Sequence, residues 1–157
     1  MGWLFPSVVA AFCSTIVFAL TYLYLYRAEG EKYFGIWTIS WSVYSLRFLC
    51  VLLILSFGPN TFLQLGTQLS PLISSLFLVL GTAWWIERKV HPLFWIASFL
   101  IGVWIVMAHF LKFSFWITTI PTFFFLGGVY IWTGVVIIRF SFQAAFARHI
   151  AGWVFIL

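Results

Sequence analysis

The sequence is dominated by five long apolar blocks, separated by short segments of charged or turn-forming residues. Each block is 19–25 residues long, and only one of them contains a charged side chain. A helix needs about 20 apolar residues to cross the hydrocarbon core of a bilayer, whereas membrane barrel strands alternate polar and apolar residues over about ten positions. The pattern therefore predicts an all-α, polytopic integral membrane helix bundle. The predicted helices cover about 5–26, 33–57, 62–86, 93–111 and 115–138.

Composition excludes a water-soluble domain. Of the 157 residues, 64% are hydrophobic, 23% are aromatic and only 7% are charged, whereas soluble domains have roughly 25% charged residues. The net charge is +5, but the Lys and Arg residues stand singly or in pairs and form no stripe that could follow the phosphates of a nucleic acid. We therefore expect the lipid bilayer, and no nucleic acid, as a partner.

The end of the sequence predicts one further helix. It begins at about 149, after Arg148, and is still apolar at Leu157, where it has only about half the length that a bilayer requires. We expect five full spans and a truncated sixth, with seven spans in the intact protein. Residues 1–157 would then be a single transmembrane domain within a longer chain.

The charges between the blocks predict the orientation. The loops near 27–32, 87–92 and 139–148 contain six Lys or Arg residues in total, whereas the other two loops contain only Lys112. Basic loops are retained in the cytoplasm, so these three loops are predicted to be cytoplasmic and the N-terminus to lie outside the cell membrane. No basic segment precedes the first block, which is interpreted as a retained helix rather than a signal peptide.

Two segments carry a resemblance to a known class of proteins. The run Tyr-Leu-Tyr-Leu-Tyr-Arg-Ala-Glu-Gly-Glu-Lys-Tyr-Phe-Gly-Ile-Trp at 22–37 is followed by Trp-Ser-Val-Tyr-Ser-Leu-Arg at 41–47. Together they resemble the opening helices of bacterial multi-pass sensor modules that precede histidine kinase, PAS or diguanylate cyclase domains. Residues 148–157 are similar to the penultimate helix of those modules. The resemblance implies a sensory input domain of the bacterial inner membrane, as in two-component systems, whose cytoplasmic output domain lies outside this sequence.

Arg47 is the chemical anomaly among the apolar blocks. It lies well inside the second block, where a charge costs about 2.5–3.5 kcal/mol on insertion scales, so we expect it to face the bundle interior. Residues spaced by three and four positions share a helix face with it: Trp37, Ser40, Trp41, Tyr44 and Phe48. One interpretation is that Arg47 binds an anionic or carbonyl-bearing ligand, or changes partners during signalling. The other is that it reaches the membrane surface or bonds carbonyl and hydroxyl oxygens of neighbouring helices.

The two cysteines raise a metal or redox hypothesis. Cys13 and Cys50 would lie at similar depths in antiparallel neighbouring helices, and His109 lies near the same end of the fourth block. Such a set could bind Cu(I) or Zn, or the thiols could form a redox pair. None of these residues has motif spacing, and buried cysteines commonly behave as small hydrophobic residues, so we favour no metal, and the sequence leaves the identity of any cofactor unknown.

Small residues in the third block indicate close helix packing. Gly66, Ser70, Ser74 and Gly81 fall on one side of the predicted helix, which lets another backbone approach. A ligand cleft or the seam of a homodimer are the alternative interpretations. Pro71 and Pro121 lie inside spans and should kink them. Gln68 is expected to bond the carbonyl that Pro71 leaves free.

No catalytic motif is visible, so enzymatic activity would reside in a kinase or cyclase domain of the full-length protein. Paired carboxylates, a Ser-His-Asp order, a glycine-rich phosphate loop and an HExxH motif do not occur. The preferred function is therefore a membrane-embedded sensory domain that couples an extracytoplasmic or intramembrane signal to an output domain. A small transporter or channel and a structural subunit of a membrane complex are the alternatives.

Overall fold

The computed structural model describes residues 3–141, and this range folds into five α-helices without a strand. All five are long and apolar enough to cross a membrane, which confirms the predicted all-α class. Their bounds are α1 Leu4–Glu29, α2 Lys32–Phe57, α3 Thr61–Trp85, α4 Pro92–Phe110 and α5 Phe115–Ser141. The predicted sixth helix, with Arg148 and His149, lies outside the described residues.

The helix ends differ from the prediction by up to three residues, most clearly at the end of α1. The sequence predicts a polar loop over 27–32, but α1 continues through Glu29, so only Gly30 and Glu31 separate it from α2. Charged side chains are compatible with a helix, whereas Gly30 takes a left-handed backbone conformation at φ 72° and ends it. In the same way, α5 includes Arg139 in its last turn.

The remaining helix ends have local chemical causes. Gly58 closes α2, and its N–H donates to the carbonyl of Ile54 at 2.9 Å. The Asn60 side chain caps α3 by accepting a hydrogen bond from the backbone N–H of Phe62 at 2.9 Å. His91 precedes α4, where Pro92 occupies the first turn and needs no hydrogen-bond partner for its nitrogen.

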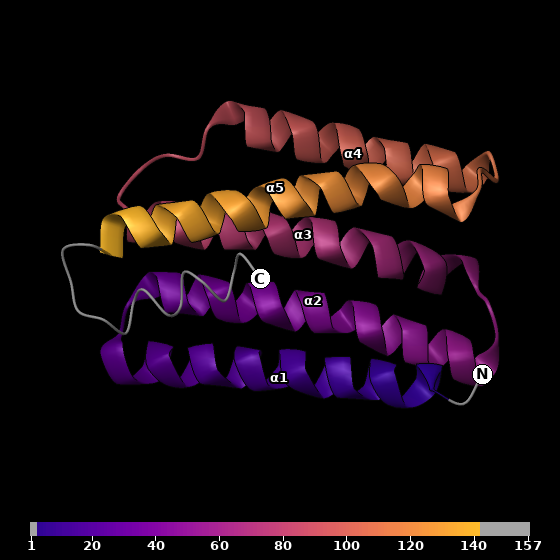
Figure 1. Ribbon diagram of the computed structural model, residues 1–157, viewed down its shortest axis with the longest axis horizontal. Coiled ribbons are helices and arrows are strands. Elements are labelled where there is room, and N and C mark those ends of the chain that lie inside the picture. The colour runs from indigo at the N-terminus through magenta and orange to yellow at the C-terminus, as the bar shows by residue number, and fades with distance from the viewer. Residues whose placement is uncertain (1–2, 142–157) are drawn as a thin grey trace.

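The helices lie side by side and run alternately up and down, with α3 at the centre (Figure 1). α1 packs on α2, α2 packs on α3, and α3 also packs on α4 and α5. The α1–α2 and α3–α4 connections and the end of α5 lie at the same end of the bundle (Figure 1). We call it the basic end because basic side chains gather there: Arg27, Lys32, Arg88, Lys89 and Arg139.

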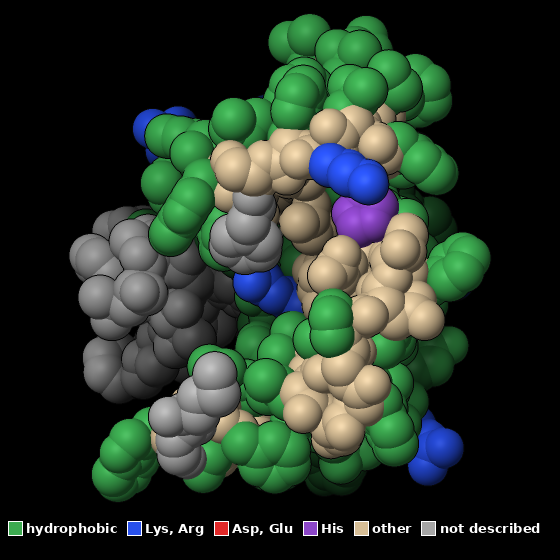
Figure 2. All heavy atoms as spheres, turned by 90° about the vertical axis from the view of Figure 1, so that its right-hand side faces the viewer, with side chains coloured by type: hydrophobic (Ala, Val, Ile, Leu, Met, Phe, Trp, Pro, Cys, Tyr) green, Lys and Arg blue, Asp and Glu red, His purple; other side chains and the backbone are tan. Residues whose placement is uncertain are grey.

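The opposite end contains the α2–α3 and α4–α5 connections. Figure 2 shows this end, where hydrophobic side chains predominate and no Asp or Glu is visible. Large apolar side chains also cover the outside of the helices: Phe124 is 80% exposed, and Phe99 is 70% exposed. Such a surface is compatible with lipid rather than with water.

Many hydroxyl groups along the helices are satisfied within their own helix. Thr21, Ser42 and Thr82, for example, donate to the carbonyl oxygens of Val17, Thr38 and Leu78 at 2.8 Å. A polar group in hydrocarbon has no water to bond, so this arrangement lets many Ser and Thr side chains reside in a membrane span at little cost.

The small residues of α3 form a close helix seam, and the helix that packs there is α2. A Cβ atom at Gly81 would lie 2.6 Å from Cδ1 of Trp37, and one at Gly66 would lie 2.9 Å from Sγ of Cys50. Between these two contacts, the Ser40 hydroxyl of α2 donates to the backbone carbonyl of Ser74 at 2.8 Å. The small residues therefore allow α2 and α3 to approach closely over most of their length.

Candidate functional site

A polar cavity of about 100 Å³ lies between α2, α3 and α5. α2 and α5 both pack on α3, but no Cα atoms of α2 and α5 lie within 8 Å of each other, and side chains line the space between them. We call this space the Arg47 cavity. Its walls are formed by Arg47 and Val51 of α2, by Thr67, Gln68 and Pro71 of α3, and by Thr119, Thr122, Phe123 and Leu126 of α5.

Arg47 supplies the charge of the cavity. By helical rise it lies about 15 Å from the Phe57 end of α2 and about 22 Å from the Lys32 end. Both distances place it within a hydrocarbon core about 30 Å thick. Its guanidinium carbon is 5.6 Å from the ring centre of Phe123 and 6.0 Å from that of Phe48. These two rings provide cation–π contacts on α5 and α2.

The described part of the chain offers the Arg47 guanidinium no hydrogen-bond acceptor. Within residues 3–141, Arg47 forms neither a hydrogen bond nor an ion pair, although its five N–H groups all seek acceptors. An unpaired charge inside a membrane protein is costly unless water, a ligand or a neighbouring group satisfies it. The side chain is half-buried, so the cavity is where such a partner could reach it.

Three oxygen atoms in the cavity wall are also unpartnered. Oε1 of Gln68 and the hydroxyls of Thr119 and Thr122 are buried, and none of them has a hydrogen-bond partner within the described part of the chain. Nearly all buried polar groups in proteins are paired, so a cluster of exceptions indicates water or a ligand. The cavity thus combines a positive donor with three polar oxygens.

The structure divides the six predicted site residues between three places. Arg47 and Gln68 come together in the cavity, although they are on different helices. Trp37 and Ser40 are buried in the α2–α3 seam instead. The other two, Trp41 and Tyr44, form edge-to-face ring contacts along α2, and neither lines the cavity.

Gln68 does not have the partner that the sequence predicts. Pro71 leaves the carbonyl of Thr67 without its helical donor, but within residues 3–141 the Gln68 side chain makes no hydrogen bond. The corresponding carbonyl below Pro121 is that of Ile117, and it accepts from the indole N–H of Trp104 at 3.3 Å. A free carbonyl is thus satisfied at the other proline, Pro121, by a side chain of a neighbouring helix.

Sequence reasoning missed the contribution of α5. Thr119 and Thr122 flank Pro121 and provide two of the three unpartnered oxygens. The signal was present as a run of threonines around an intramembrane proline at 118–122. A lone Thr in a span is usually satisfied by its own helix, so nothing in the sequence separates these two residues from the others.

The described residues do not bring the three weak candidates for a metal or redox site together. Cys13 is exposed and Cys50 is buried, and both thiols are free. Across residues 3–141, no three His, Cys, Asp or Glu side chains come close enough to hold a metal ion, so His109 does not join the two cysteines. Equal depth in neighbouring helices does not fix the direction in which a side chain projects. Cys50 projects toward Gly66.

Residues 3–141 contain five helices that are long and apolar enough to cross a membrane, which indicates a multi-pass membrane protein in contact with lipid. No known protein family, no curated protein and no solved structure matches the sequence.

Proposed function

We propose that this chain is the membrane-embedded input region of a signalling protein, and that the Arg47 cavity is the site at which the signal is received. The observation that carries the proposal is that, among the described residues, the Arg47 guanidinium has no ion pair or hydrogen bond and lies beside three oxygens that also have no partner there. Structural arginines in membrane spans pair with neighbouring groups or carbonyls. A site that leaves all of these groups open is suited to a ligand.

The chemistry of the cavity selects the kind of ligand. Guanidinium groups bind carboxylates and carbonyl oxygens, and the Thr119 and Thr122 hydroxyls can donate or accept. A volume of about 100 Å³ accommodates only a small polar group. We therefore propose that the ligand presents a carboxylate or carbonyl group to Arg47, while any apolar remainder lies outside the cavity among the lipid chains.

Binding can be transmitted because the cavity joins helices that are otherwise separate. α2 and α5 interact here through Arg47 and Phe123 rather than through close backbone packing. A ligand that draws the guanidinium away from Phe123 weakens this link, whereas the α2–α3 seam stays packed. Such a ligand shifts the position of α5 by as much as its affinity differs between the two arrangements.

The proposal includes a topology. The basic end is cytoplasmic, the N-terminus is outside, and the signal passes to a cytoplasmic kinase or cyclase output domain. Single cysteines in a Cys13→Ala, Cys50→Ala background test the orientation. A membrane-impermeant maleimide should label Asn60→Cys in intact cells, whereas Gly30→Cys should be labelled only after permeabilisation. The reverse pattern would contradict the proposed topology.

Spin-label distances between α2 and α5 test the signalling step. Labels at Phe57 and Ile117, both exposed near the opposite end, report the separation of the two helices in lipid nanodiscs. Decanoate should shift the distance distribution, whereas decanol should not. Arg47→Leu should abolish the shift, and Arg47→Lys should retain part of it because the positive charge remains.

An equal response to decanoate and decanol would contradict a carboxylate site, since both would then act through the bilayer. Loss of the response in Thr21→Val, a matched control whose hydroxyl bonds only its own helix, would show that the assay reports general stability. Solute flux into proteoliposomes that Arg47→Leu abolishes would favour the transporter alternative instead.

A further inference from the structure

A second cavity, of about 350 Å³, lies at the basic end between the end of α3, the start of α4 and the last turns of α5. It is separate from the Arg47 cavity, and the two share no residue. Its interior wall is apolar and is formed by Val79, Ala83, Phe94, Trp132 and Val136. Its rim contains Arg88, Lys89, His91 and Arg139, and no acidic residue lines it.

From this geometry we propose that the cavity binds an anionic phospholipid, with the lipid phosphate at Arg88 and the start of its acyl chains against the apolar wall. The depth of the cavity fits such a ligand. Val79 lies seven residues before Ile86 at the rim, and Trp132 lies seven residues before Arg139. Each separation corresponds to about 10 Å of helix. The cavity therefore extends from the membrane interface into the region of the chains. Its volume is at the lower end of small-molecule sites, so it holds the headgroup region and leaves the chain ends in the bilayer.

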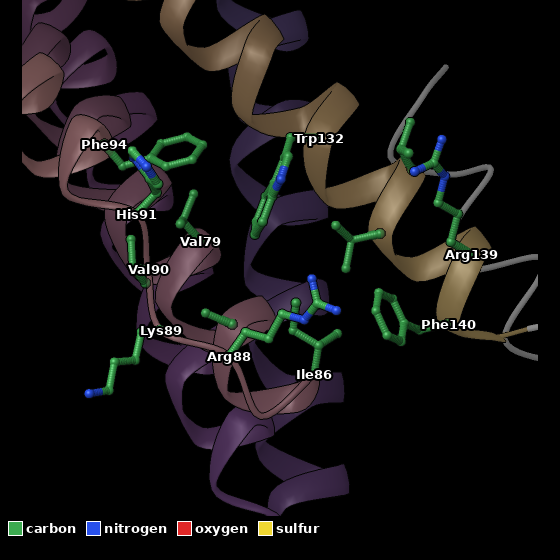
Figure 3. Close-up of a pocket in the computed structure, with 13 residues that line it drawn as sticks. Val79, Ile86, Arg88, Lys89, Val90, His91, Phe94, Trp132, Arg139 and Phe140 are labelled. Carbon is green, nitrogen blue, oxygen red and sulfur yellow. The ribbon is translucent and has the colours of Figure 1, made fainter.

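Arg88 provides the specific contact. Its side chain extends from the α3–α4 connection across the cavity, and Lys89 points away from it (Figure 3). The guanidinium carbon of Arg88 lies 5.5 Å from the ring centre of Phe140 on α5. Within the described range, Arg88 forms no ion pair, so its N–H groups remain free for the bidentate contact that phosphate favours.

The backbone fixes the position of Arg88. Its N–H donates to the carbonyl of Ala83 at 2.9 Å, and the preceding Glu87 takes the left-handed conformation at φ 54°. This is the pattern of a Schellman helix end, formed here by a non-glycine residue. The turn places Arg88 at the mouth of the cavity, and Glu87 is exposed and is not part of the wall.

His91 can add a second donor. Its Nδ1 accepts the backbone N–H of Leu93 at 3.3 Å, so the neutral ring carries its proton on Nε2 and can donate from there. A basic pocket between membrane helices at the side of the positive loops is a recognised setting for acidic lipid headgroups. A zwitterionic lipid carries its own cation, which the basic rim repels.

Native mass spectrometry of the full chain in detergent tests the proposal with three probes: phosphatidylglycerol, phosphatidylcholine and inorganic phosphate. Phosphatidylglycerol should be retained in preference to phosphatidylcholine. Arg88→Gln should weaken its binding about fivefold, the effect of one cation near an acidic lipid. Arg27→Gln is the matched control, since Arg27 lies at the same end but not in the cavity, and should leave binding unchanged.

Val135→Trp is the second variant, because it fills the cavity from a partly exposed position without removing a charge. It should displace phosphatidylglycerol while the thermal stability of the protein is retained. Equal retention of both lipids would overturn the proposal. Equal losses in Arg88→Gln and Arg27→Gln would also overturn it, because they would show attraction to the basic end as a whole. Full competition by inorganic phosphate would show that the acyl chains contribute nothing, and would overturn the assignment of a lipid.

Discussion

Trp37 of α2 lies directly over Gly81 of α3, so close that a Cβ atom on Gly81 would be 2.6 Å from Cδ1 of the indole ring. Trp37 is buried and belongs to a buried apolar cluster with Leu78, Val79 and Val129. The ring is also held by edge-to-face contacts with Tyr22 and Tyr33 at 5.4 Å between ring centres. It therefore has no room to retreat from α3.

The first prediction concerns this contact. Gly81→Ala should lower the free energy of unfolding by about 1–3 kcal/mol, the usual cost of forcing extra volume into a packed interior. Gly128→Ala is the matched control, because a Cβ there meets nothing within 4 Å, and it should leave stability unchanged or slightly higher. Thermal unfolding in the same detergent measures both. A Gly81→Ala variant as stable as wild type would contradict the close packing of α2 against α3 at this position.

A second prediction separates packing from redox chemistry at Cys50. Gly66→Ala should destabilise the protein, because its new Cβ would lie 2.9 Å from Sγ of Cys50. Adding Cys50→Ala removes that sulfur and should restore most of the loss, since the nearest remaining atom would be Cβ of residue 50 at 3.9 Å. A double-mutant cycle measures this coupling. Additive effects would show that the two residues do not touch.

The third prediction concerns the hydrogen bond between α2 and α3. Ser40→Ala removes the hydroxyl that donates to the carbonyl of Ser74 and should cost about 0.6 kcal/mol, typical of interhelical hydrogen bonds in membrane proteins. Ser42 is two residues away but bonds only Thr38 of its own helix, so Ser42→Ala should have no comparable effect. If both variants lose the same stability, the interhelical bond contributes nothing of its own.

Block length was enough to predict the five helices, because a membrane requires about 20 apolar residues per span and leaves few alternatives. The same reasoning identified the small-residue side of α3, since Gly66 and Gly81 can only be useful where another helix comes close. It could not predict which helix would approach. That depends on tertiary packing, here the fit of Trp37 and Cys50 of α2.

The candidate site was predictable only in part. Arg47 and Gln68 are conspicuous because polar groups are rare inside spans, but the cavity depends equally on Thr119 and Thr122 of α5. Most threonines in this protein bond their own helix, and these two do not. That difference is not visible in composition.

The last prediction distinguishes a functional Arg47 from a structural one. Within residues 3–141, Arg47 has neither an ion-pair nor a hydrogen-bond partner, so its replacement breaks no ion pair and removes a charge that costs about 2.5–3.5 kcal/mol to insert. Arg47→Leu should therefore leave the protein as stable as wild type or more stable, as measured by thermal unfolding without ligand. Gain of stability with loss of function is typical of binding sites. Phe123→Leu provides the comparison, since it keeps the charge, removes the ring on α5 that lies 5.6 Å from the guanidinium, and should be mildly destabilising. Clear destabilisation by Arg47→Leu would instead show that the role of Arg47 is structural. Its contacts with Phe48 and Phe123 would then hold α2 and α5 together.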